Sequence, residues 1–467
     1  MLINSIFTIE ISQKIIRELL SKGGDFAEIY VEKSSLRSIS CEENKIESIA
    51  SGMDFGVGLR LIRGEETYYG SINTTSVDEI LALARNLSVV KTFSKLSGNK
   101  FLAATLQSKT IHEIKKDPNM VDIDEKIALV NRVNAGAWKH DAKVCQVQVD
   151  YGDKTKEVFI ANSQGLNCQE KRIYLVLALN VVAQDGKIIQ TSREVLGGLT
   201  GFELFAEPAV DGLVERAVRR ALKMLEAKSA PSGKMPVVLS SDAGGTMIHE
   251  AIGHSLEADA VQKGISPVYV GKVGQPIASN LITVLDDATL ANRRGSFSFD
   301  DEGTPAQRTV LVEKGILKNY LYDLFTANKD GKKSTGNGRR ESYHFKPIPR
   351  MTNTMIAPGG HDPAKVISST PKGLFVKKMG GGQVNTATGD FVFEVTEAYE
   401  IVNGGIGQPV RGAILTGNGP EVLRSIDMVG SDINFEIGTC GKDGQHVPVS
   451  DGQPTLRIPE IIVGGTE

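Results

Sequence analysis

The residue types best suited to chemistry occur together in MIHEAIGHSLEAD, residues 247–259, which contains His249, Glu250 and His254. Two imidazoles on one helix can hold a transition metal, and an adjacent carboxylate can act as a base toward a water molecule at an open coordination position. The segment follows a short apolar strand and a turn at 242–245, so we expect a helix that begins at this turn. This combination indicates a hydrolytic metal site.

The two histidines are five residues apart, which is an unusual spacing for two ligands on one face of a helix. Side chains four residues apart lie about 40° from each other around an α-helix axis, whereas side chains five residues apart lie about 140° from each other. His249 and His254 therefore cannot both face one metal from a regular helix. We expect a distortion at Ile252-Gly253. Either a π-bulge realigns the two histidines, or the helix ends near Gly253, whose missing Cβ lets the backbone turn and bring His254 back.

A third protein ligand is needed, since catalytic zinc usually takes three and leaves a fourth position open. The residues that could supply it are Cys440, Glu257, Asp259, His446 and His344. Cys440 follows a predicted strand and is flanked by glycines, so a flexible loop could present its thiolate to a metal. An inert buried thiol is the plainer interpretation of Cys440, and solvated acids are the plainer interpretation of Glu257 and Asp259. We favour Cys440 as the third ligand.

The first 230 residues predict a mixture of helices and strands around this site. Amphipathic spacing predicts helices at 8–22, 75–90, 122–138 and 210–228, with Ser76 as an N-cap. Alternating apolar residues predict strands at 26–35, 36–43, 55–72, 142–152, 156–165 and 172–184. A polar stretch at 91–122 predicts a connection between two similar units.

A change of composition at Ala230-Pro231-Ser232-Gly233 marks the predicted boundary between two domains. We expect an N-terminal α/β domain at 1–230 and a β-rich catalytic, metal-binding domain at 231–467. In the second, glycine-broken segments predict strands, and the metal-binding helix is the exception. The predicted fold class is therefore α+β. The segment GKKSTGNGRR, residues 331–340, lacks the spacing of a phosphate loop and predicts a mobile basic surface loop.

Composition excludes several classes of protein. The chain has 467 residues, 40% of them hydrophobic, and a net charge of −3, which is typical of a soluble globular protein with a sizeable core. No basic tract indicates a nucleic-acid partner, and no apolar run reaches the length of a membrane span. The four cysteines, Cys41, Cys145, Cys168 and Cys440, are too sparse for a disulfide framework. The N-terminal segment lacks the pattern of an export signal, so we expect a cytoplasmic protein.

Three segments together resemble the TldD/PmbA family of metallopeptidases, once named modulators of DNA gyrase. They are MIHEAIGHSLEAD at 247–259, GMDFGVGLR at 52–60 and GTCGKDGQ at 438–445, and the resemblance covers essentially the whole chain. It is closest to the TldD-type, metal-bearing member, whose HExxxH helix and distant C-terminal cysteine map onto the residues named above.

That resemblance implies a zinc ion held by His249, His254 and Cys440, with Glu250 as the general base. It also implies a cytoplasmic peptidase that acts on unfolded peptides and forms a dimer enclosing the site. The partner could be a second copy of the chain or a metal-less paralogue. We expect the substrate to be an extended peptide that adds to a sheet edge beside the helix.

An alternative function is a non-catalytic, peptide-binding or chaperone-like partner subunit that keeps the helix for a structural metal. Glu250 argues against it, because a structural site needs no acid beside its ligands and would close its fourth position with another Cys or His. A direct gyrase modulator would need DNA contacts that the sequence does not support. No oxyanion donor is assigned among the candidates, which are His446, Tyr343, His344 and Arg339.

Overall fold

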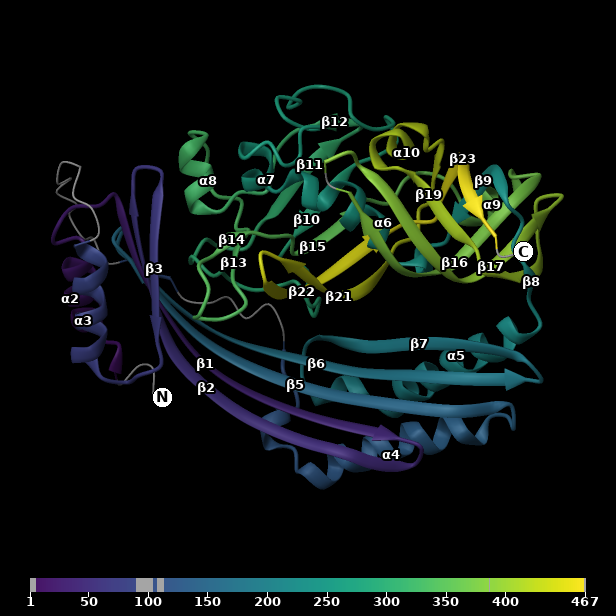
Figure 1. Ribbon diagram of the computed structural model, residues 1–467, viewed down its shortest axis with the longest axis horizontal. Coiled ribbons are helices and arrows are strands. Elements are labelled where there is room, and N and C mark those ends of the chain that lie inside the picture. Colours follow the sequence, from purple (N-terminus) through teal and green to yellow (C-terminus); the bar gives the residue numbers. More distant parts are fainter. Residues whose placement is uncertain (1–5, 90–103, 107–112, 386, 466–467) are drawn as a thin grey trace.

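The computed structural model describes residues 6–89, 104–106, 113–385 and 387–465, and it confirms the predicted α+β class. Figure 1 shows a long curved sheet formed by the first half of the chain, with the second half seated above it. Most of the polar stretch predicted as a connection at 91–122 lies outside the described residues. No helix in the described part of the chain is long and apolar enough to cross a membrane.

Within the described residues, the curved sheet has seven strands in the order β3-β2-β1-β5-β6-β4, and β7 pairs with the same edge of β6 as β4, further along that strand. Their bounds are β1 (Phe26–Glu42), β2 (Lys45–Arg63), β3 (Glu66–Ile72), β4 (Ala104–Leu106), β5 (Val144–Asn162), β6 (Leu166–Asp185) and β7 (Ile188–Leu199).

Two predicted breaks in this sheet are wrong. The strands predicted at 26–35 and 36–43 form the single strand β1, and those predicted at 142–152 and 156–165 form β5. The two long strands pair with each other through the predicted breaks, for example at Ser35 opposite Thr155. Continuous hydrogen bonding to a neighbouring strand therefore outweighs the turn preference of the local polar residues.

Four helices of the described chain cover one face of the sheet. They are α2 (Ile9–Leu19), α3 (Val77–Ser88), α4 (Ile123–Lys139) and α5 (Glu207–Leu225), and the Ser76 side chain caps α3 as predicted. Successive residues of a strand point to opposite faces. On β1, Ile29 and Val31 pack with α2 and α3, whereas Tyr30 packs with Phe299 of the second half. Both faces of the sheet are therefore buried in this region.

The second half contains a closed ring of strands and a separate six-stranded sheet. The ring consists of β9 (Gly233–Leu239), β23 (Leu456–Gly464), β19 (Ile414–Asn418), β17 (Asp390–Val402) and β16 (Lys372–Val384), and pairing of β16 with β17 closes it. The six-stranded sheet runs β12 (Ile316–Leu317), β11 (Arg308–Glu313), β10 (Val284–Asp287), β15 (Asn353–Ile356), β22 (Gln445–Gln453) and β21 (Asn434–Lys442). Strand β21 is the last in this order, so one of its edges has no partner strand among the described residues.

Buried ion pairs join the two halves. Arg340 of the second half binds Glu28 of β1, and Arg60 of β2 binds Glu302 at 2.6 Å. The segment 331–340 was predicted to be a mobile surface loop, and its second part is not, because Arg339 and Arg340 are each 2% exposed. The local sequence is loop-like, but partners on β1 and around the second half bury its arginines.

Candidate metal centre

The helix that carries the histidines is irregular, as the spacing predicts. It begins as α6 (Thr246–Ile248), continues as a π-helical turn, η4 (His249–Gly253), and ends as a 3-10 turn, η5 (His254–Leu256). The backbone N–H of His254 donates to the carbonyl of His249, five residues earlier. One extra residue in the turn places side chains five apart on one face. The predicted distortion is thus confirmed, and it takes the form of a π-bulge.

The role expected for Gly253 is wrong. Its backbone is helical, with φ −55° and ψ −59°, so any residue could adopt it. A Cβ at this position would lie 2.1 Å from Sδ of Met351, which is fully buried. Glycine is needed here because Met351 packs against the turn, and not because the backbone reverses.

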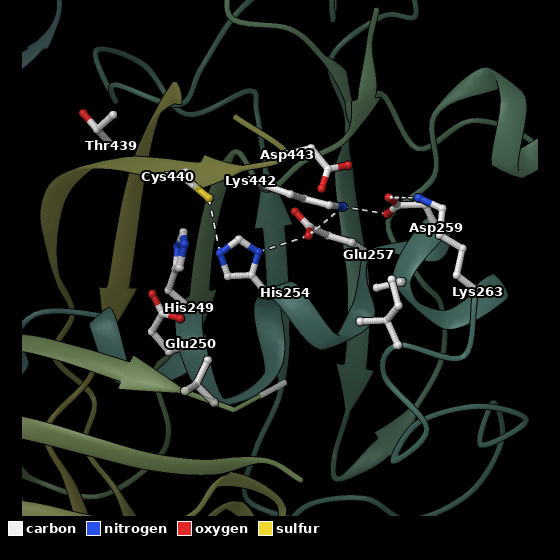
Figure 2. Close-up of a pocket in the computed structure, with 14 residues that line it drawn as sticks. His249, Glu250, His254, Glu257, Asp259, Lys263, Thr439, Cys440, Lys442 and Asp443 are labelled. Atoms are coloured by element: carbon white, nitrogen blue, oxygen red, sulfur yellow. Dashed lines mark hydrogen bonds and ion pairs between the residues drawn. The ribbon is translucent and has the colours of Figure 1, made fainter. Parts of the chain in front are cut away.

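Three of the predicted site residues come together at this turn. His249, His254 and Cys440 each offer one donor atom, and these atoms lie within 4.8 Å of one another. The two imidazole rings are nearly perpendicular, with centroids 4.9 Å apart. Cys440 projects from β21, and its Sγ lies 3.4 Å from Nε2 of His254 (Figure 2). The pairing of β21 with β22 therefore brings the distant cysteine to the histidine turn.

Carboxylates orient both imidazoles. Nδ1 of His249 lies 2.8 Å from Oδ1 of Asp451 on β22, and Nδ1 of His254 lies 3.0 Å from Oε2 of Glu257. These contacts occupy Nδ1 and leave Nε2 of each ring to bind a metal, which is how carboxylates usually support histidine ligands. Nζ of Lys442 in turn lies 3.0 Å from Glu257 and 2.6 Å from Asp259. Figure 2 shows that the two acids considered as third ligands lie on the side of His254 that faces away from Cys440.

The cluster holds Cys440 as a thiolate. Burial alone would raise the pKa of this thiol, but hydrogen bonds from His249 and His254 lower the pKa to about 5. For His254 the directions are reversed. Burial alone would lower the pKa of its imidazole, but the charge of Glu257 raises the pKa to about 9. A metal ion that binds here would displace the imidazole protons, so metal affinity should depend on pH.

The donor set fits zinc. One thiolate and two imidazoles are ligands that zinc prefers, and all three side chains are largely buried. A cavity of about 370 Å³ opens beside them, and its wall includes Glu250, Thr439 and Val384. We call it the histidine cavity. It leaves room for a substrate on the open side of the cluster.

The other sequence candidates lie elsewhere. Tyr343 is buried between the two halves, and the exposed His344 packs on its ring. His446 is two-thirds exposed and faces Glu341. Sequence reasoning missed Asp451 and the role of Lys442. Aspartate is depleted in strands, so an acid in the β22 segment was the one signal that could have marked Asp451.

Three domain models of one family match most of the chain. A PmbA/TldA metallopeptidase domain 1 matches residues 27–89, the central domain matches 116–225, and the C-terminal domain matches 232–465. The C-terminal match contains the histidine turn, Cys440 and Asp451.

Curated relatives and a solved structure agree with these matches. The chain is 38% identical to a metalloprotease TldD homologue of Haemophilus influenzae, over 95% of this chain and 93% of the relative. It is 37% identical to a metalloprotease TldD homologue of Buchnera aphidicola, over 97% and 95%. A Thermotoga maritima crystal structure, described as a candidate modulator of a DNA gyrase, aligns with TM-score 0.80, 22% identity and coverage of 98% and 100%. At this low identity, the similarity to the Thermotoga maritima structure shows only that the two chains share a fold.

Proposed function

The chain belongs to the PmbA/TldD family of metallopeptidases, and on that premise we propose that it is a zinc-dependent peptidase that hydrolyses unfolded or short peptides. The observation that carries this proposal is the open histidine cavity, whose wall contains the Glu250 carboxylate together with the three donor residues. A purely structural site would have no such opening and would have a fourth ligand.

Zinc would be held by Nε2 of His249, Nε2 of His254 and Sγ of Cys440. When bound, the ion supplies a Lewis acid that polarises the scissile carbonyl and makes a water molecule more acidic. Asp451 and Glu257 keep the two imidazoles in the required tautomer and orientation. The carbonyl of Cys440 accepts a hydrogen bond from Nη2 of the buried Arg350 at 2.5 Å, which fixes the strand that carries the thiolate.

Glu250 would transfer the proton. Its side chain is half-buried on the cavity wall, and no hydrogen bond or ion pair with another described residue occupies its carboxylate. A carboxylate without protein partners can take a proton from water and deliver it to the leaving amine nitrogen. We therefore assign the role of general base to Glu250 and to no other acid of the cavity wall.

The substrate would bind as an extended strand. Cys440 lies on β21, whose outer edge has no partner strand in the described chain. Backbone groups at such an edge can pair with any extended peptide, largely independently of its sequence. A folded protein cannot present a free strand of this kind, so we expect unfolded proteins and short peptides to be cleaved and compact native proteins to resist.

The replacement Glu250→Gln tests the mechanism. We expect it to retain zinc, measured by elemental analysis, and to lose about 10²–10⁴-fold in the hydrolysis of an unstructured fluorogenic peptide. The matched control is Glu421→Gln, an exposed carboxylate on α10 (Gly419–Ser425), a helix that packs against the histidine turn.

Three outcomes would contradict the proposal: two concern the role of Glu250, and the third concerns the peptidase activity itself. Activity of Glu250→Gln within about threefold of the wild type would mean that another group activates the water. Loss of zinc together with activity would make Glu250 a ligand or a support of one. If the wild-type protein binds zinc and peptide and never cleaves, the chaperone-like function predicted as the alternative is correct.

A further inference from the structure

A second cavity, of about 280 Å³, lies between the curved sheet and the second half of the chain. Six of its lining residues are Lys or Arg, and three are Asp or Glu. We call it the arginine cavity. Its walls come from β1, β5 and β6 below and from β21, β22 and the segment 339–341 above.

Half of the cations in this cavity have carboxylate partners. Arg172 lies 2.7 Å from Asp301, Lys156 lies 3.0 Å from Glu32, and Arg340 binds Glu28. The other three, Lys154, Arg294 and Arg339, make no ion pair with any carboxylate of the described chain. The cavity therefore contains three cations that no carboxylate of the described chain binds directly.

Two of these three cations, Arg294 and Arg339, also have a buried N–H group without an acceptor in the described chain. Arg339 is 2% exposed, and its Nη1 and Nη2 donate to the carbonyls of Met351 and Pro448, whereas its Nε has no partner among the described residues. Nε of Arg294 is buried and without a partner in the same way. An unsatisfied buried donor on a charged group is costly, and a bound anion would remove that cost.

Desolvation acts on all three cations. Burial lowers the pKa of Arg294 and of Arg339 below the usual value, and burial together with the charge of Lys156 lowers the pKa of Lys154. Carboxylates act in the opposite direction, because Glu341 raises the pKa of Lys154 and Asp301 raises that of Arg339, but burial outweighs them.

Thr439 connects the two cavities. It precedes Cys440 on β21 and lines both of them, and its Oγ1 accepts a hydrogen bond from Nη2 of Arg294 at 3.4 Å. Neighbouring residues of a strand face opposite sides of the sheet. Cys440 faces the histidines, while Thr439 points away from them (Figure 2), toward the side on which its cross-strand partner Pro448 lines the arginine cavity.

We propose that the arginine cavity binds a carboxylate of the peptide substrate, carried by the residue that pairs opposite Thr439. Side chains directly opposite each other on paired strands lie on the same face. A peptide added to the edge of β21 would therefore place one residue toward the histidine cavity and the next toward the arginine cavity. The position of the carboxylate rests on the proposed peptidase function, whereas the anion site itself does not.

The test measures binding rather than turnover. Four matched, N-acetylated alanine-rich peptides carry an internal Glu or an internal Gln, each with a C-terminal carboxylate or a C-terminal amide. Their dissociation constants are measured by calorimetry with full-length zinc-loaded Glu250→Gln protein, which leaves the peptides uncleaved. We expect a carboxylate to tighten binding about 10-fold or more, the effect of one charge-assisted hydrogen bond. An effect of the internal Glu identifies a side-chain site, and an effect of the terminal group identifies a C-terminal site.

Two variants assign the effect to the cavity. Arg294→Gln and Lys154→Gln, separately and together, should abolish most of the preference for the carboxylate peptides. The control Lys223→Gln removes a cation that is half-exposed on α5 and should leave the preference unchanged. Neither Arg294 nor Lys154 is as deeply buried as Arg339, so we expect both variants to fold. Circular dichroism verifies that they do.

The outcomes separate this proposal from the peptidase proposal. Equal binding of all four peptides, no binding of any peptide, or a preference that survives the double variant overturns the carboxylate site. A carboxylate preference in a wild-type protein that never cleaves supports the carboxylate site and overturns the peptidase. Cleavage of peptides without any preference for a carboxylate supports the peptidase and overturns the carboxylate site.

Discussion

The histidine cavity and the arginine cavity lie on opposite faces of the same β21–β22 hairpin, and they differ in how their charges are compensated. At the histidine cavity, Asp451 contacts His249, Glu257 contacts His254, and Lys442 forms an ion pair with Glu257. In the arginine cavity, Arg294 and Arg339 each keep a buried N–H without an acceptor in the described chain.

This difference indicates two ways of preparing a site. A site for a metal ion must hold its donors in one geometry before the ion arrives, so carboxylates orient the imidazoles. Among His249, His254, Asp451, Glu257 and Lys442, the one buried polar atom without a partner in the described chain is Oε1 of Glu257. A site for an anion can instead leave cations without partners and accept a loss of stability, which the ligand removes when it binds. The following predictions test whether the two cavities really differ in this way.

The largest effect is expected for Cys440→Ser. A hydroxyl is a poor ligand for zinc, so the affinity should fall by more than the roughly 10–100-fold that is typical when only a supporting residue is changed. Competition with a chromophoric chelator measures it, and Cys145→Ser, an exposed thiol on β5, is the control. A full equivalent of zinc bound by Cys440→Ser at wild-type affinity would show that another residue is the third ligand.

Asp451→Asn should lower zinc affinity by about 10–100-fold, because the amide no longer fixes His249 in the ligating orientation. The same variant should leave the binding of carboxylate peptides at the arginine cavity unchanged. Metal and peptide titrations of one protein sample measure both. If both affinities fall together, the two cavities are coupled and the contrast between them is wrong.

Gly253→Ala should lower the free energy of unfolding by about 1–3 kcal/mol, since its Cβ would overlap Sδ of Met351. The backbone at this position is helical, where alanine is intrinsically better than glycine by about 1 kcal/mol. The double variant Gly253→Ala, Met351→Ala should therefore lose less stability than the sum of the two single variants. Urea unfolding measures all four proteins, and strict additivity would show that packing against Met351 is not the reason for glycine.

Lys154→Met should have the smallest effect and the opposite sign, a gain of about 0.5–2 kcal/mol at pH 7. The folded protein lowers the pKa of Lys154, so the charged lysine destabilises the fold below that pKa. The penalty disappears as the pH rises through the folded pKa to the unfolded value, near 10.4. Urea unfolding at a series of pH values should thus show the gain shrinking as the solution becomes alkaline. A loss of stability at pH 7 would mean that Lys154 has a compensating partner.

Local features of the site could be predicted from the sequence, and features that depend on distant partners could not. A distortion of the helix follows from the spacing of His249 and His254, because helix periodicity is a property of the segment itself, and the structure shows which of the two expected forms it takes. The continuous strand β1 does not, since its pairing with β5 cancels the break that the local sequence favours. The buried Arg339 was missed for the same reason, because its surroundings come from other parts of the chain.

The sequence by itself determined the α+β class, the irregular helix and the residue types for a metal site. Only the tertiary structure decided that Sγ of Cys440, a residue 186 positions beyond His254 in the chain, lies 3.4 Å from Nε2 of that histidine. It also placed Asp451 behind His249 and brought uncompensated arginines to the other side of the same strand. The physical reason is that strand pairing sets contacts by register between distant segments, and no pattern within either segment encodes its partner.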